Sequence, residues 1–294
     1  MKKIFKKKLI NDYLGLEKSI EVPYIKKITG GFKVDIQKYS GLVAVKDKSI
    51  RKKTLIAWGS KLFSNKFSGN FYNPRIPAVI ARLTYVFETI NSQINIKNKK
   101  ICDVGGGDGY FLELLKKKTD KKNLIGVELS KSNCEILKKK KLRSFHGSFE
   151  QFHKNNKRKF DLITFNWTLC NTSNPLELID LASKKVNKNG YVAITESSRI
   201  LVPFKKPIQL FIPKEDPAYH PYFFSKNSLM NILLLNNLKP IFINKYIDTD
   251  YLLIIAKKSN NNLLDKIKLD DFKKVKKFFS DWYNESKKYS KDLY

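Results

Sequence analysis

From residue 101 to residue 258, short apolar runs alternate with segments whose apolar residues recur at helical spacing. The first run is ICDV, and six more follow at 123–129, 144–147, 159–167, 191–198, 239–247 and 250–258. Strands that alternate with helices of this length predict a doubly wound, mostly parallel α/β sheet of seven strands. The last two runs have no helix between them. We therefore expect them to pair as a hairpin, with the last strand antiparallel.

The rest of the chain lies on either side of this unit. Residues 1–75 contain short strand-like pieces and turns, which predict a small N-terminal region. We place the alternating domain at 76–258, opened by an amphipathic helix, and expect Asn189-Gly190 to end the helix before the fifth run. Residues 259–294 repeat apolar residues among lysines, which predicts an amphipathic C-terminal helix. We expect this helix to pack on its own domain. A dimer contact and an anionic membrane surface are the alternatives.

Composition restricts the class of protein. With 42% apolar and 29% charged residues, the 294-residue chain can bury a core. Its three cysteines stand far apart and no histidine cluster is present, so we expect neither a disulfide scaffold nor a metal site. No apolar run reaches the roughly 18–20 residues that cross a bilayer, and the basic start lacks the apolar run of a signal peptide. These features predict a cytoplasmic protein.

The net charge of +31 raises the question of an anionic partner. Only six of the 58 basic residues are arginine, however, and arginine is the residue that reads phosphates and base edges with paired hydrogen bonds. We therefore interpret the lysine excess as a solvated surface. Nucleic acid, a membrane surface or a phosphorylated substrate stay open as alternatives.

The sharpest motif, DVGGGDGY at 103–110, stands directly between the first strand and its helix. Its glycines allow a tight turn and let a ligand touch the main chain; they are Gly105, Gly106, Gly107 and Gly109. A carboxylate about 4 Å from a phosphate costs about 4 kcal/mol at an effective dielectric of about 20, so Asp103 and Asp108 disfavour a pyrophosphate. Tyr110 occupies the place of the third dinucleotide glycine. S-adenosylmethionine (SAM) carries no phosphate, and we predict it rather than NAD as the cofactor.

Glu128 ends the second strand, where a carboxylate can accept hydrogen bonds from both ribose hydroxyls of an adenosine. We assign Glu128 and the following Leu129 to the cofactor site. The alternative is a surface glutamate that caps the helix beginning near Ser130.

Residues 100–258 resemble the class I SAM-dependent methyltransferases. ICDVGGGDGYF is similar to their glycine-rich motif, GVELS to their ribose motif, FDLITFNWTLCNTSNP to their fourth strand and its loop, and NGYVAIT to their fifth strand. The resemblance implies a Rossmann-like fold and methyl transfer from SAM. It also implies that Ser148 and Phe149 contact the adenine, and that Asn166 and Trp167 face the cofactor's methyl group.

A finer resemblance concerns HPYFFSKNSLMNILLLNNLKP, which is similar to a segment of small-molecule and sugar C-methyltransferases. Those enzymes carry a cysteine-rich zinc module in their N-terminal third, where Ser40 stands here in place of a cysteine. The resemblance therefore implies no metal in this chain. Many relatives have an acid-His pair after the fourth strand, where this sequence has Cys170-Asn171.

His220 is the candidate catalytic residue. It follows the fifth strand, where the chain passes over the carboxyl ends of the strands, whereas His146 and His153 lie on the adenine side. A histidine near its ordinary pKa of about 6.5 can exchange a proton at neutral pH. We expect it to orient or deprotonate the acceptor, with Tyr219 and Tyr222 shaping the pocket. A structural histidine in a turn between prolines is the alternative.

Two other groups carry weaker predictions. We interpret Cys170 as a small buried residue rather than a nucleophile. Tyr72, Asn73 and Arg75 precede the first helix of the domain, where they form either a lid over the methionine end of the cofactor or a plain helix-start turn.

Together these features predict SAM-dependent methyl transfer to a small polar acceptor, such as a nucleotide-linked sugar or a saccharide precursor. An RNA methyltransferase, or a non-catalytic RNA-binding protein that keeps the fold, is the alternative. The scarcity of arginine and the lack of a recognisable RNA-binding module disfavour both.

Overall fold

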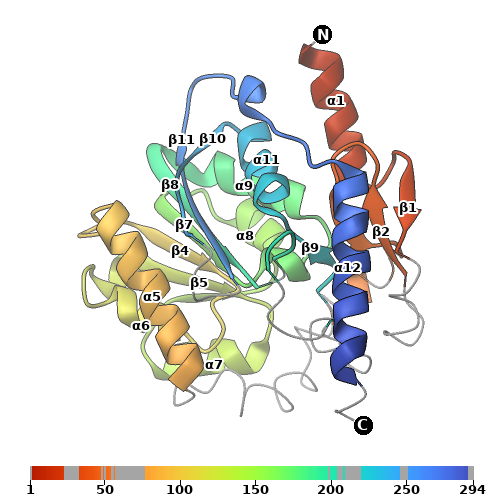
Figure 1. The fold of residues 1–294 in the computed structure, drawn as a ribbon. Coiled ribbons are helices and arrows are strands. Elements are labelled where there is room, and N and C mark those ends of the chain that lie inside the picture. The colour runs from red at the N-terminus through yellow and green to blue at the C-terminus, as the bar shows by residue number, and fades with distance from the viewer. Residues whose placement is uncertain are drawn as a thin grey trace.

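The computed structural model describes residues 2–22, 33–47, 49, 51–53, 56, 77–197, 199–203, 208, 220–245 and 251–290. Its main feature is a seven-stranded sheet of order β10-β11-β8-β7-β4-β5-β6 (Figure 1). The strands are β4 (Ile101–Val104), β5 (Leu124–Glu128), β6 (Ser144–His146), β7 (Phe160–Asn166), β8 (Val186–Glu196), β10 (Leu238–Ile243) and β11 (Leu252–Lys258). Only β11 runs antiparallel to its neighbours, β8 and β10. The predicted sheet with an antiparallel last strand is confirmed.

Helices cover both faces of this sheet. On one face lie α8 (Phe149–Asn155), α9 (Pro175–Lys185) and α11 (Lys226–Leu235). On the other lie α5 (Pro77–Gln93), α6 (Tyr110–Leu115) and α7 (Lys131–Lys139). Successive side chains of β7 alternate between the two apolar cores, with Leu162 on the second face and Ile163 on the first. A strand buried on both faces needs apolar residues throughout, which is why these strands read as continuous apolar runs.

Short polar side chains fix where four of these helices begin. Each accepts a hydrogen bond from a backbone N–H in the first turn, and they are Ser130, Ser148, Asn174 and Ser225. Such caps satisfy donors that have no partner inside the helix. Ser130 and Ser148 also place α7 and α8 directly after the carboxyl ends of β5 and β6.

A second, antiparallel sheet joins the N-terminal region to the main domain. Its order is β1-β2-β3-β9, where β1 is Ser19–Glu21, β2 is Val34–Gln37, β3 is Val43–Val45 and β9 is Tyr222–Phe223. Because β9 lies just before α11, the pairing of Ala44 with Tyr222 connects segments that are far apart in the sequence. The predicted boundaries at residues 75 and 258 stay predictions.

The C-terminal helix α12 (Phe272–Ser290) lies beside this small sheet (Figure 1). Its Val275, Phe279 and Trp282 are buried in the apolar core of the small sheet. The helix therefore packs on its own chain, as predicted. It begins later than expected: Leu264 lies in a 3₁₀ turn, η4 (Leu264–Lys266), and Asp271 accepts the Lys273 N–H at the helix start.

Two other predicted elements are wrong. Residues expected to form only strands and turns include a helix, α1 (Lys2–Tyr13), which buries Leu9 and Tyr13 one turn apart. Its apolar spacing is helical, but five surrounding lysines obscure the pattern. Asn189-Gly190 does not end α9, because Val186 already pairs with Phe160 of β7 and both residues lie inside β8.

Among the described residues, no helix is both long and apolar enough to cross a membrane. Within the same ranges, no group of three or more His, Cys, Asp or Glu side chains is arranged to hold a metal ion.

Candidate active site

The glycine-rich loop connects β4 to α6 at the carboxyl edge of the main sheet. Gly105, Gly107 and Gly109 have φ values of 73°, 53° and 84°, in the left-handed region that favours glycine. A Cβ on Gly109 would lie 2.3 Å from Leu137 Cδ2, so this position has no room for a side chain. The Gly105 N–H donates to the Val127 carbonyl oxygen at 2.8 Å, which ties the loop to β5.

Glu128, the last residue of β5, faces this loop. Its Oε2 accepts the Gly107 N–H at 2.9 Å, and its Oε1 accepts the Ser130 N–H at 2.8 Å. Burial raises the pKa of Glu128, while these hydrogen bonds lower it. Ser130 itself caps α7, so Glu128 is not the surface cap of that helix. A carboxylate has about four acceptor positions, and the Gly107 and Ser130 N–H groups occupy two of them.

The two aspartates of the loop are engaged within the protein. Asp103 Oδ1 accepts the Thr164 hydroxyl at 2.6 Å and the Asn166 amide at 3.2 Å, and burial raises the pKa of Asp103 to about 7. Asp108 Oδ1 accepts the Tyr110 N–H at 3.2 Å, and its Oδ2 lies 4.0 Å from Lys140 Nζ. Their repulsion of a pyrophosphate is therefore weaker than expected. Tyr110, in the third-glycine position, remains the argument against a dinucleotide.

The residues predicted to contact adenine have structural roles. Ser148 and Gln151 form a reciprocal cap at the start of α8. Phe149 is buried and packs edge-on against Phe165. Leu129 accepts the His146 Nε2–H at 3.1 Å through its carbonyl oxygen. All three residues follow the carboxyl ends of β5 and β6. The contact of Ser148 and Phe149 with adenine, and the place of Leu129 in the cofactor site, stay predictions.

The carboxyl end of β7 carries two further predicted residues. The Asn166 amide lies between Asp103 and Thr195, whose hydroxyl donates to Asn166 Oδ1 at 3.2 Å. Trp167 has a φ of 53°, which a bulky residue rarely adopts. Its Nε1 is buried and has no hydrogen-bond partner within the described ranges. An unpaired buried donor costs about 1–3 kcal/mol, so this N–H is suited to a ligand that accepts a hydrogen bond.

His220 lies against the 3₁₀ turn η3 (Leu169–Asn171) that follows β7. Asn171 Nδ2 donates to the Trp167 carbonyl oxygen at 3.0 Å, so Asn171 Oδ1 is the atom that lies 2.8 Å from His220 Nδ1. An amide oxygen only accepts hydrogen bonds. Nδ1 therefore carries the proton, and Nε2 is the basic nitrogen of the neutral ring.

The Cys170 thiol lies 3.4 Å from the same His220 Nδ1. Because Nδ1 donates to Asn171, it does not take the thiol proton, and Cys170 is fully buried. This geometry fits the interpretation of Cys170 as a buried residue rather than a nucleophile.

Tyr222 is hydrogen-bonded within the protein. It is buried, accepts a hydrogen bond from Arg51 Nη1 at 2.9 Å and donates to the Ser173 carbonyl oxygen at 2.9 Å. Tyr222 thus connects the N-terminal region to the loop after η3, and its place in an acceptor pocket stays a prediction. Tyr72, Asn73, Arg75 and Tyr219 lie outside the described residues.

Comparison with known proteins now identifies the family. A family model described as "Methyltransferase domain" matches residues 74–241, more than half of the chain. The chain belongs to this methyltransferase family. The prediction made from the glycine-rich and ribose motifs is confirmed, and the match contains the loop, Glu128 and the His220 cluster.

The relatives of this methyltransferase are distant. The chain is similar to the ubiquinone biosynthesis O-methyltransferase of Aliivibrio fischeri, with 27% identity over 40% of this chain and 51% of that protein. The match therefore covers about half of that relative's length. The fold of this chain is similar to that of a SAM-dependent methyltransferase of Thermotoga maritima, with a TM-score of 0.51 and 19% identity. The match covers 70% of this chain and 100% of that one. The fold is also similar to that of magnesium protoporphyrin IX methyltransferase of Synechocystis with bound SAH, with a TM-score of 0.53, 14% identity and coverage of 72% and 100%.

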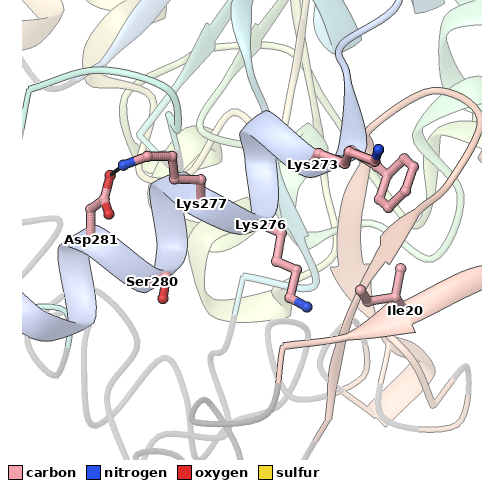
Figure 2. A pocket seen from close by; sticks show the side chains of 7 residues that line it. Ile20, Lys273, Lys276, Lys277, Ser280 and Asp281 are labelled. Atoms are coloured by element: carbon pink, nitrogen blue, oxygen red, sulfur yellow. Dashed lines mark hydrogen bonds and ion pairs between the residues drawn. The ribbon is translucent and has the colours of Figure 1, made fainter.

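A groove of about 440 Å³ lies away from this site, between α12 and the outer strand β1 of the small sheet (Figure 2). It is lined by Ile20, Phe272, Lys273, Lys276, Lys277, Ser280 and Asp281. Lys277 pairs with Asp281 at 2.6 Å. Since β1 and β9 are the opposite edges of the small sheet, the groove is not part of the site around His220.

Glu196, a buried acid of the methyltransferase domain, was not predicted from the sequence as a functional residue. Glu196 ends β8, is fully buried, and accepts the Leu169 N–H of η3 at 2.7 Å. Burial raises the pKa of Glu196 to about 8. In the sequence it resembles any polar residue at the end of a strand, and its partner is a backbone group.

These raised pKa values predict a pH-dependent stability. Asp103, with a pKa of about 7, and Glu196, with a pKa of about 8, favour the protonated form in the folded protein. Their contribution is fully present below the unfolded pKa of about 4 and is lost as the pH rises through about 7–8. We expect the free energy of unfolding to fall as the pH rises from about 4 to about 8, and to fall less steeply in Glu196→Gln. Urea denaturation of both proteins at several pH values checks this, and parallel curves would contradict it.

Proposed function

We propose that this protein transfers a methyl group from SAM to a small polar acceptor, and that His220 removes or holds the acceptor's proton. The observation that supports the proposal most is the arrangement along the carboxyl edge of the sheet. Glu128 on β5, the glycine loop after β4, and His220 over the turn after β7 follow one another in the order of the strands.

The residues present fit this cofactor. Glu128 offers acceptor positions to the ribose hydroxyls, and the glycines let the methionine part approach the main chain. Trp167 Nε1 is a buried donor without a partner among the described residues, and it is suited to a carboxylate. When bound, SAM supplies an electrophilic methyl group on a sulfonium.

The protein's own part is to align the acceptor and to manage its proton. Asn171 fixes the His220 ring so that Nε2 is the nitrogen able to accept a proton. A nucleotide-linked sugar or saccharide precursor is the acceptor that the sequence favours, and the lysine-rich surface would suit its phosphates.

Incubation with methyl-tritiated SAM and fractions of a host extract tests this function. We expect label in the small-metabolite fraction. Label in RNA would favour the alternative of an RNA methyltransferase. Absence of transfer to any fraction, together with RNA binding that weakens steeply with salt, would favour a non-catalytic RNA-binding protein.

Glu128→Ala should weaken binding of S-adenosylhomocysteine by about 10- to 100-fold, because hydrogen bonds to a charged group contribute about 1.5–3 kcal/mol. Isothermal titration calorimetry measures the change. Glu135→Ala, an exposed position on α7, is the matched control and should bind normally. Equal affinity of Glu128→Ala and the wild type would contradict the ribose assignment.

A further inference from the structure

Glu196 stands at the carboxyl end of β8, beside the turn that holds His220. Its side chain is fully buried. The opposite residue on β11 is Leu252, and the neighbouring pair toward β7 is Thr195 with Asn166, so those strands bring no charge to it. Among the described residues, η3 carries Cys170, and the segment before β9 carries His220. The buried Arg199, which follows β8, donates to the carbonyl oxygen of Tyr251, next to Leu252.

The Glu196 carboxyl holds the start of η3. Oε1 accepts the Leu169 N–H at 2.7 Å. The other oxygen, Oε2, is buried and has no hydrogen-bond partner among the described residues. An acid that accepts this N–H anchors the turn more firmly than an apolar side chain would, because the buried N–H of Leu169 would otherwise lose its acceptor.

The turn η3 contacts the imidazole of His220. Cys170 Sγ lies 3.4 Å and Asn171 Oδ1 lies 2.8 Å from His220 Nδ1. Both contacts come from consecutive residues of η3. A displacement of the turn would therefore move both of them away from the ring.

We propose that Glu196 is a positioning residue for His220: by anchoring η3, it keeps the imidazole with Nδ1 protonated and Nε2 as the basic nitrogen. This role rests on the proposed function, in which His220 handles the acceptor's proton. Glu196 acts through η3 and does not need to touch cofactor or acceptor.

The ring's tautomer can be measured on the full chain without any ligand. ¹⁵N NMR distinguishes the two protonated nitrogens, and the chain has only three histidines, so variants of His146 and His153 assign the signals. In the wild type we expect His220 to be protonated at Nδ1. In Glu196→Leu, which cannot accept the Leu169 N–H, we expect the Nε2-protonated form to predominate.

Two further variants separate positioning from general destabilisation. Ile255→Val, a core change on β11, lies on the face of the sheet opposite to the core that contains Leu169 and Cys170; it lowers stability and should keep the wild-type tautomer. Glu196→Gln keeps an acceptor for the Leu169 N–H and should also keep the tautomer. It should lack the change in His220 shifts that the wild type shows as Glu196 ionises near pH 8.

Activity gives a second readout once the acceptor is known. Glu196→Leu should lower kcat by about 10²-fold through misplacement of the base, with KM for SAM unchanged and Glu196→Gln close to wild type. A wild-type tautomer in Glu196→Leu would overturn the proposal. So would an Nε2-protonated His220 in Glu196→Gln, which keeps the acceptor for the Leu169 N–H and decides the matter even if Glu196→Leu does not fold. Failure of the proposed function has a different signature, namely wild-type protein that binds no S-adenosylhomocysteine.

Discussion

Gly107→Arg is expected to abolish binding of S-adenosylhomocysteine while the protein stays folded. Gly107 has a φ of 53°, and its N–H donates to Glu128 Oε2. An arginine here places a guanidinium within reach of the Glu128 carboxylate, where it occupies the acceptor positions needed by the ribose and adds a cation beside the sulfonium site. The backbone cost of a side chain in this conformation is about 1–2 kcal/mol.

A matched control separates backbone strain from loss of the site. Gly15 has a similar φ of 69°, lies in the N-terminal region, and has only Gln37 Nε2, at 3.8 Å, near the place of a Cβ. Gly15→Arg therefore carries a similar strain and should bind the ligand normally in calorimetry. Wild-type affinity in Gly107→Arg would contradict the placement of the cofactor.

His220→Ala should lower turnover by about 10²–10⁴-fold, the usual contribution of a general acid or base. Affinity for S-adenosylhomocysteine should not change, because His220 contacts the turn after β7 rather than the glycine loop. Steady-state kinetics with the acceptor found by tritium labelling measures the first effect, and calorimetry measures the second. His153→Ala on α8 is the control and should keep full activity. Full activity of His220→Ala would contradict the proposed proton transfer and would indicate that His220 is a structural residue.

The order of the elements was predictable because each local signal agrees with the global fold. The apolar runs match strands buried on both faces, and the glycine loop falls where a strand turns into a helix. Glu128 was predictable for the same reason, since its position at the end of a strand next to the loop limits what it can face.

Contacts between distant segments were not predictable. Nothing local in KYSGLVAV or HPYFFS indicates that Ala44 pairs with Tyr222 or that Tyr222 is buried. His220 was selected by its place in the topology, but nothing in the sequence indicated that Cys170 and Asn171 contact its ring. Glu196 acts on a backbone N–H, which leaves no trace in the sequence.

The central claim is that the loop between β4 and α6 and Glu128 form a SAM site, and calorimetry of the wild-type protein tests it most directly. Titration with S-adenosylhomocysteine should give micromolar affinity, about −8 kcal/mol, and titration with NAD should give no measurable binding. Tight binding of NAD with no response to S-adenosylhomocysteine would contradict the account.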